Sequence, residues 1–367
     1  MSDQVSQSPP VPRTAGFIRI RIPSPGIGAA LLAALLFGAS TPFAKLLTGN
    51  LPPVLLAGLL YLGSGMGLGA ILLIRNRGVP HLNLSRHDLL WLAGAIILGG
   101  ILGPVLLMIG LVNTEASSAS LLLNFESVFT ALLAWFVFRE NVDKRIAVGF
   151  VLIVCGGVLL SWVPGGGFSL SVGLLAVLGA CLCWGFDNNF TQKISAADPL
   201  QIASLKGLVA GVFNVALAIV SGVTIPGLPV VGGALVVGLV GYGASLALFV
   251  FALRHLGTAR TSAYFSVAPF AGAALSLLLL GESLAPLFAL AGILMGIGVW
   301  IHMTEHHSHA HEHTRLVHSH AHVHDDHHQH DHEKSEVVQE PHHHLHEHEP
   351  MIHRHPHYPD IHHRHHH

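Results

Sequence analysis

Two long apolar runs on either side of a short charged turn make up residues 115–162, which read EASSASLLLNFESVFTALLAWFVFRENVDKRIAVGFVLIVCGGVLLSW. The charged turn between the runs is RENVDKR, residues 139–145. Each run is close to the roughly 20 residues that an α-helix needs to cross a bilayer at about 1.5 Å per residue. The stretch therefore predicts a hairpin of two helices in a membrane.

A second copy of this hairpin follows about 142 residues later, over residues 257–301. In the second copy Glu282 takes the place of Glu140 after the first apolar run, and Gly298 falls on Gly156. The sequence therefore predicts a duplicated, all-α integral membrane protein.

The composition agrees with a bilayer location. Of 367 residues, 51% are hydrophobic and 10% are charged, which is too few charges to cover a water-soluble protein of this size. A net charge of -2 without a basic stripe gives no indication of nucleic-acid binding. No constellation typical of an enzyme or of a required cofactor stands out, so we predict neither.

The apolar residues fall into ten predicted membrane spans, five in each half. These spans are residues 27–47, 52–74, 89–111, 116–138, 146–162, 170–192, 200–222, 229–251, 259–280 and 285–303. The first apolar run continues to about Leu47 without a small-residue cleavage site, which favours a retained span over a cleaved signal peptide. The predicted organisation is an N-terminal segment (1–26), a first repeat (27–162), a second repeat (163–303) and a polar tail (304–367).

Lysine and arginine residues predict the orientation of these spans. With both termini in the cytoplasm, all but Lys45 and Lys206 of the basic residues before the tail fall in cytoplasmic segments, as the positive-inside rule requires. Five spans per half is an odd number, so the second repeat would be inverted relative to the first. Inverted repeats are typical of transporters, although a structural or receptor-like bundle is the alternative.

Smaller features also repeat or suggest packing. Phe37-Gly38 in the first span matches Trp184-Gly185 in the sixth. Glycines four residues apart, such as Gly207 and Gly211, allow helix backbones to approach closely within one chain, and could equally mark a subunit contact in a homodimer.

These motifs resemble the EamA family of the drug/metabolite transporter superfamily over about residues 25–303. The second half carries the P-x-F centre at Pro269 and the Gly-Glu turn at Glu282, whereas the first half has Ser127 where the family favours proline. Without that proline, the resemblance alone does not predict a helix break near Ser127, and gating by this segment could differ from that of the family. The resemblance implies an inner-membrane carrier, an exporter of a small metabolite.

Glu126 is the leading candidate for coupling transport to protons. It lies near the middle of the fourth span, where an ionised side chain costs at least ~2.5 kcal/mol, so the carboxyl must be neutral or partnered. Such a carboxyl could titrate during transport, or could simply be a protonated hydrogen-bonding group between helices. Asn124, two residues away, is a candidate to assist it.

A polar triplet, Asp187, Asn188 and Asn189, lies in the sixth span, and Lys206 lies at a similar depth in the seventh. An ion pair between Asp187 and Lys206 would offset two costly charges, and could be structural, a gate, or a contact for a zwitterionic substrate. Lys45, near the outer end of the first span, is expected to extend towards the membrane surface.

The tail is a second candidate site. Of 30 histidines, all but His81, His87 and His255 lie between His302 and His367, many of them in alternation. Imidazoles at i and i+2 of an extended segment could share one Zn, Ni, Co or Cu ion. The predicted ligands are His307, His309, His311, His313, His318, His320, His322, His324, His327, His328, His330 and His332. No fixed four-ligand spacing appears, which predicts exchangeable sites on a disordered segment.

Three functions remain open from the sequence. The first is a transporter of a small molecule across the lipid bilayer, with a tail that senses or buffers divalent transition-metal ions. The second is a transporter of the metal or a metal chelate, and the third is a membrane-anchored protein for metal storage or interaction. A metal carrier needs ligands along the membrane path, and the predicted spans contain no histidine before His302.

Overall fold

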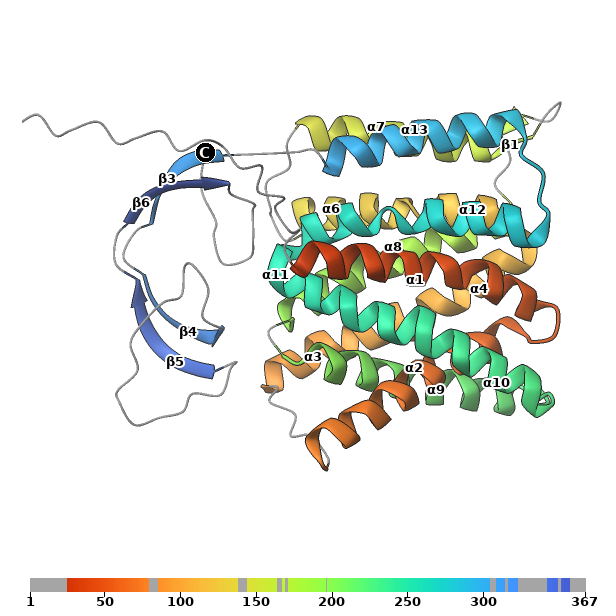
Figure 1. Cartoon of the computed structure of the whole chain (residues 1–367), viewed down its shortest axis with the longest axis horizontal. Helices are drawn as coiled ribbons and strands as arrows, with labels where there is room; N and C mark the ends of the chain where they lie inside the picture. The colour runs from red at the N-terminus through yellow and green to blue at the C-terminus, as the bar shows by residue number, and fades with distance from the viewer. Residues whose placement is uncertain are drawn as a thin grey trace, which may run out of the picture.

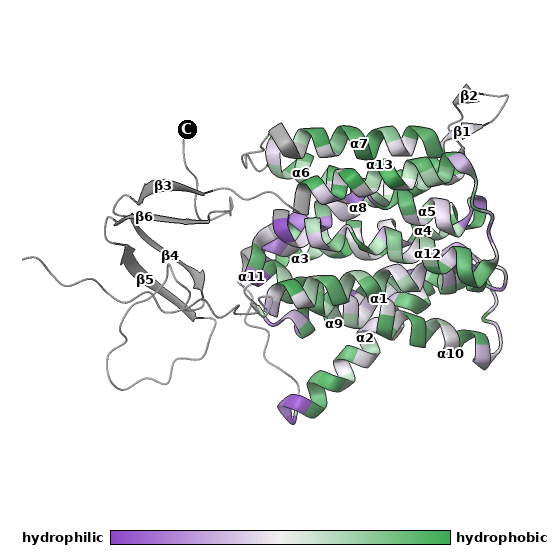
Figure 2. Ribbon diagram, turned by 45° about the horizontal axis from the view of Figure 1, so that its top comes forward, coloured by the Kyte–Doolittle hydropathy of each residue, from purple (hydrophilic) through white to green (hydrophobic). Residues whose placement is uncertain are grey.

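The computed structural model describes residues 25–78, 85–137, 144–163, 167–168, 171–195, 197–303, 308–313, 316–322, 342–348 and 351–356. Residues 25–303 form a bundle of helices that run roughly side by side (Figure 1). Apolar residues cover most of the length of these helices, and polar residues gather near the ends of the bundle (Figure 2). Large apolar side chains such as Leu90, Phe136 and Leu278 face outward, as they do on a surface that contacts lipid.

The two halves of the bundle have the same order of helices. The first half consists of α1 (Pro25–Thr48), α2 (Pro53–Asn76), α3 (Arg86–Ala95), η1 (Ile96–Leu102), α4 (Gly103–Asn113), α5 (Ala116–Leu122), α6 (Phe125–Phe136) and α7 (Lys144–Leu160). The second half consists of α8 (Val172–Lys193), α9 (Pro199–Val220), α10 (Leu228–Val237), η2 (Gly238–Ala244), α11 (Ser245–Phe265), α12 (Ala268–Leu280) and α13 (Pro286–Met303). A short antiparallel pair, β1 (Trp162–Val163) and β2 (Gly167–Phe168), lies between the halves.

Eight helices in the described residues are long and apolar enough to cross a membrane. The remaining two apolar helices are α7, with 17 residues, and α13, with 18 residues. At about 1.5 Å per residue such helices are somewhat shorter than the roughly 30 Å hydrocarbon core. The described residues therefore contain eight candidate spans of the ten predicted, and α7 and α13 lie where the spans 146–162 and 285–303 were predicted, with about the predicted lengths.

Glycines let the two halves approach closely. Helices α2 and α9 pack against each other, and a Cβ on Gly207 would lie 2.5 Å from the nitrogen of Gly65. Likewise, a Cβ on Gly211 would overlap the backbone of Leu62. Helix α7 packs against α13, where a Cβ on Gly298 would lie 2.7 Å from the carbonyl oxygen of Gly149. These glycines serve close packing between the halves of one chain.

Each half contains one seven-residue π-helical segment inside a longer helix. The segment η1 interrupts the helix made of α3 and α4, and η2 lies 142 residues later between α10 and α11. A π-helical turn releases backbone carbonyls from the regular i→i+4 pattern, and such turns are frequent at functional sites. The duplication is therefore visible in the irregular turns as well as in the regular helices.

Each half also contains a helix that is broken near its middle. Leu123 and Asn124 separate α5 from α6, and Ser266 and Val267 separate α11 from α12. All four residues have 3₁₀-like backbone angles, with ψ between -3° and -24°.

The first half is broken although it lacks the proline of the family motif. Side chains replace the missing proline, because the Asn124 amide donates to the carbonyl of Leu121 at 2.9 Å and the Ser127 hydroxyl donates to the carbonyl of Asn124 at 2.8 Å. Counted from the start of each helix, Glu126 in α6 occupies the position of Pro269 in α12.

Part of the histidine-rich tail is described as extended backbone. Strand β3 (Ser308–His313) pairs antiparallel with β6 (Met351–Pro356), and β4 (Leu316–His322) pairs antiparallel with β5 (His342–His348). These paired segments differ from the disorder expected for residues 304–367. The alternation of histidine with other residues has a period of two, which suits an extended strand.

Candidate functional site

A cavity lies between the two halves of the bundle. Its walls come from α1, α2, α6, α8, η2 and α11, so both halves contribute. The aromatic residues of the wall are Phe37, Tyr61, Trp184, Tyr242, Phe249 and Phe265. The polar residues are Glu126, Asp187, Asn188 and Ser245.

The aromatic rings pack around Phe37. Its ring centroid lies 5.7 Å from that of Trp184, 5.6 Å from that of Tyr242 and 5.5 Å from that of Phe265. The pair with Trp184 is edge-to-face, with an interplanar angle of 85°. The repeated Phe37 and Trp184, which the sequence paired between halves, therefore meet in one wall of the cavity.

Carbonyls of η1 hold several of these walls in place. The Tyr61 hydroxyl and the Trp184 indole both donate to the carbonyl of Gly99, at 2.7 Å and 3.0 Å. The Asn214 amide donates to the carbonyl of Ile101 at 3.4 Å. The π-helical segment thus binds side chains from α2, α8 and α9 and fixes the orientation of two cavity rings.

Glu126 lies in the first turn of α6, directly after the helix break, and its side chain faces the cavity. It is buried, with 9% of its surface exposed, and its Oε1 accepts a hydrogen bond of 2.9 Å from the Asn188 amide. The same amide lies 3.1 Å from the Thr130 hydroxyl. Within the described residues Glu126 has no ion-pair partner.

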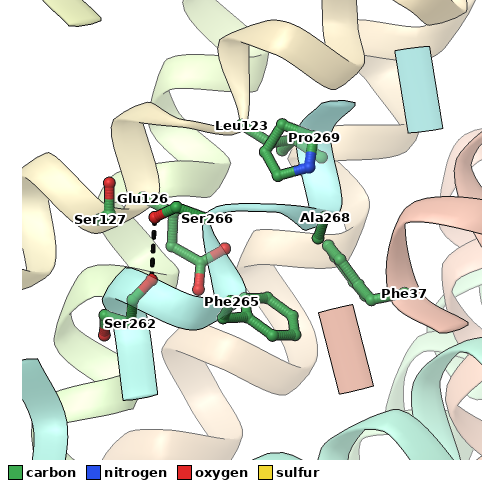
Figure 3. Close-up of a pocket in the computed structure, with 9 residues that line it drawn as sticks. All are labelled: Phe37, Leu123, Glu126, Ser127, Ser262, Phe265, Ser266, Ala268 and Pro269. Atoms are coloured by element: carbon green, nitrogen blue, oxygen red, sulfur yellow. Dashed lines mark hydrogen bonds between the residues drawn. The ribbon is translucent and has the colours of Figure 1, made fainter. Parts of the chain in front are cut away.

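Glu126 also lines a second, smaller cavity. The two cavities share Phe37, Glu126 and Phe265, and the second adds Ser262 and Ser266 among its lining residues. Figure 3 shows Glu126 among Ser262, Ser266 and Phe265, with Ser266 bonded to the carbonyl of Ser262 at 2.8 Å. The Glu126 carboxyl therefore borders both cavities.

The predicted pair of Asp187 and Lys206 is present. The Lys206 ammonium donates to both carboxylate oxygens of Asp187, at 2.6 Å and 2.8 Å, and lies 3.3 Å from the Thr191 hydroxyl. Lys206 is 1% exposed. The pair therefore neutralises two charges at the edge of the cavity, and leaves Glu126 as the carboxyl without a counter-charge.

The remaining membrane candidates lie away from the cavity. The Asn124 amide lies 3.8 Å from the sulfur of Met295 in α13, and the Asn189 amide donates to the carbonyls of Thr130 and Gly185. Lys45 donates to the carbonyls of Leu111 and Thr114 at the end of α4. These three side chains hold helices together, so Lys45 does more than extend to the membrane surface.

The predicted metal ligands are only partly described. The backbone of His309, His311 and His313 lies in β3, and that of His318, His320 and His322 lies in β4. His307, His324, His327, His328, His330 and His332 lie outside the described residues. The part of the chain with described side chains contains no group of three metal-ligating residues. The metal site remains a prediction from the sequence.

Sequence reasoning did not identify the ring of aromatic residues as a site. Phe37 and Trp184 could have been recognised, because they occupy matching positions in the two halves. Tyr61, Tyr242 and Phe265 showed no such match in the sequence. A pair of glycines in each π-helical segment, Gly99 with Gly100 and Gly241 with Gly243, was a further feature of the sequence that could have indicated the site.

Two duplicated halves of apolar helices with a cavity between them are typical of a transporter. The model of the EamA-like transporter family matches this chain twice, over residues 24–162 and 171–304. The chain belongs to the EamA-like transporter family, and the resemblance noted from the motifs is confirmed. It follows that the protein is a multi-pass membrane protein of a transporter family.

Individual relatives agree with this assignment. An "Uncharacterized transporter" of Methanothermobacter thermautotrophicus is 28% identical over 74% of this chain and 84% of its own length. A "Probable amino-acid metabolite efflux pump" of Salmonella typhimurium is 24% identical over 75% of this chain and 93% of its own length. A solved structure titled "Crystal structure of protein" shares the fold, with a TM-score of 0.58 and 18% identity over 76% of this chain and 96% of that chain.

Proposed function

We propose that this protein is a secondary transporter that exports a small metabolite across the inner membrane. The repeats are inverted, both termini are cytoplasmic, and the substrate binds in the cavity between the halves. The observation that carries this proposal is the cavity itself, which is lined from both halves and contains Glu126 as a carboxyl without a counter-charge. A transporter of this kind exposes its midplane site to one side of the membrane at a time.

Glu126 is the residue through which proton movement is coupled to transport. Its carboxyl borders two cavities and depends on Asn188 for a hydrogen bond. A titratable group that is reached from two sides can take up a proton in one conformation and release it in the other. Asn188 positions the carboxyl, and the pair of Asp187 and Lys206 links α8 to α9 beside it.

The direction and the substrate class follow from relatives. The Salmonella relative is described as an efflux pump for amino-acid metabolites, so export of a small nitrogen-containing metabolite is the function that we carry over. The described residues that line the cavity include no histidine or cysteine, which disfavours a free transition-metal ion as the cargo. Metal transport and metal storage are therefore less well supported than metabolite export.

The tail is proposed to bind transition metals and to regulate or buffer them on the cytoplasmic side. Its alternating histidines supply neutral imidazoles, whose affinity for metal should weaken below a pH of about 6.5. Deletion of residues 306–367 should spare insertion and basal transport and remove any response to zinc, nickel or cobalt. An unchanged metal response after deletion would show that the tail is not the sensor.

The transport proposal can be tested with purified protein in liposomes. An inwardly directed pH gradient would be imposed, and its dissipation would be followed with an internal pH dye after addition of amines, amino acids, sugars and divalent metals. We expect at least one small organic compound to dissipate the gradient faster than in protein-free liposomes. A response to metals alone would replace the metabolite proposal with metal transport.

A further inference from the structure

The charged side chains that line the cavity are acidic. Among the described residues that line it are the carboxyls of Glu126 and Asp187, and no basic side chain. Asp187 is neutralised by Lys206, which lies behind it and is 1% exposed. Glu126 has no such partner, so the wall offers one carboxyl that can accept a positive charge from a ligand.

The aromatic wall suits the same kind of ligand. Phe37, Phe265, Tyr242 and Trp184 lie next to one another around the space that Glu126 borders. Aromatic faces attract ammonium groups by a cation–π interaction worth about 0.5–2 kcal/mol, and they also bury an apolar body. A protonated amine with an apolar or aromatic body meets both features.

The cavity has few donors left for a carboxylate. The Tyr61 hydroxyl and the Trp184 indole are engaged by the carbonyl of Gly99, and the Asn188 amide is engaged by Glu126 and Thr130. Lys206 is engaged by Asp187 and Thr191. A ligand carboxylate would therefore lie near Glu126 without a cation to pair with, and burying an unpaired charge is costly.

One donor remains for a neutral polar group. The Tyr242 hydroxyl is buried near the Ser40 hydroxyl, which already donates to the carbonyl of Phe37 at 2.6 Å. Its ring packs against Phe37 and Tyr61, so its position is fixed. A hydroxyl or an amide carbonyl on the ligand would satisfy it.

We propose that the cavity selects protonated amines that carry an apolar body and no free carboxylate. This inference rests on the proposed transport function and narrows its substrate from nitrogen-containing metabolites in general to decarboxylated or carboxyl-masked amines. The ammonium group pairs with Glu126, and the body lies against Phe37 and Phe265.

Three matched probes test the selection: 2-phenylethylamine, phenylalanine and 2-phenylethanol. They share one ring, and they present an ammonium alone, an ammonium with a carboxylate, and a neutral hydroxyl. Binding to the full-length protein in nanodiscs would be measured by calorimetry at neutral pH. We expect phenylalanine and 2-phenylethanol to bind at least about tenfold more weakly than the amine, which corresponds to about 1.4 kcal/mol.

Two variants test whether the preference for the amine depends on Glu126. Glu126→Gln should weaken amine binding to the level of 2-phenylethanol and leave binding of the alcohol unchanged, which also shows that the variant is folded. Glu115→Gln makes the same chemical change at an exposed position outside the cavity. This variant should change neither the affinity for the amine nor the affinity for the alcohol.

Phenylalanine binding as tightly as the amine would overturn the proposed selection while leaving the transport function standing. The proposed selection would also be overturned if 2-phenylethanol bound as tightly as 2-phenylethylamine, or if 2-phenylethylamine did not bind at all. The proposed transport of a metabolite fails only if no organic compound of the liposome panel moves.

Discussion

Gly99 allows the backbone of η1 to lie against Asp187. A Cβ at this position would overlap the Asp187 carboxylate, which is held by Lys206. At the same residue, the carbonyl accepts hydrogen bonds from Tyr61 and Trp184. A single glycine therefore links the π-helical segment to the ion pair and to two rings of the cavity.

Gly99→Ala is expected to displace Asp187 and to destabilise the fold. Separating a buried ion pair costs about 3–5 kcal/mol, so the variant should give little folded protein by size-exclusion chromatography and a lower midpoint of thermal unfolding. Gly28→Ala is the matched control, because a Cβ on Gly28 has no atom within 4 Å. Equal behaviour of the two variants would contradict the close contact at Gly99.

The pair of Asp187 and Lys206 should behave as a unit. Asp187→Asn leaves the Lys206 ammonium buried without its partner, and we expect a loss of stability of about 3–5 kcal/mol. The double variant Asp187→Asn/Lys206→Met removes both charges and should recover most of the folded yield. If the single variant folds as well as the unchanged protein, the ion pair between α8 and α9 does not stabilise the fold.

At the scale of elements, the turn between α4 and α5 is held from both sides. Lys45 of α1 donates to the carbonyls at the end of α4, and the Glu282 carboxylate accepts from the backbone N–H groups of Ala116 and Ser117, both at 2.8 Å. A cation at a helix C-terminus and an anion at a helix N-terminus are the favourable placements for the helix dipole. The second repeat thus caps a helix of the first.

Glu282→Ala removes this cap and should lower the thermal unfolding midpoint, with a cost of about 1 kcal/mol that is typical of a lost N-cap. Glu115→Ala changes a carboxylate in the same turn that makes no side-chain capping bond, and should have a smaller effect. Comparable losses from both variants would show that the charge of the turn matters and the two hydrogen bonds do not.

For the whole molecule, the orientation is a separate prediction. All but two of the basic residues before the tail fall on the cytoplasmic side when both termini are placed there. A reporter that is active only in the cytoplasm, fused after His367, should therefore be active. Activity of a periplasmic reporter at the same position would contradict the assignment.

Much of this architecture could be predicted from the sequence, because duplicated apolar runs directly encode duplicated helices. The second hairpin repeated Glu140 as Glu282 and Gly156 as Gly298, and the pairing of Asp187 with Lys206 followed from the high cost of two separate charges in a membrane. Local sequence was sufficient for these features.

The helix break and the cavity could not be predicted in this way. The break at Asn124 depends on side-chain hydrogen bonds rather than on proline. The meeting of Glu126 with Asn188 depends on how α6 and α8, which come from different halves, are rotated against each other. Such rotations are set by tertiary packing, which periodicity alone does not define.

The central claim is that the Glu126 carboxyl couples proton movement to transport. The most direct test is substrate flux driven by a pH gradient in proteoliposomes, comparing the unchanged protein with Glu126→Gln and with Glu115→Gln. The amide keeps the shape of the side chain but cannot release a proton. We predict that Glu126→Gln falls to the rate of protein-free liposomes while Glu115→Gln retains the full rate. Gradient-driven flux at the full rate in Glu126→Gln would contradict the account and leave Glu126 as a structural hydrogen-bonding group.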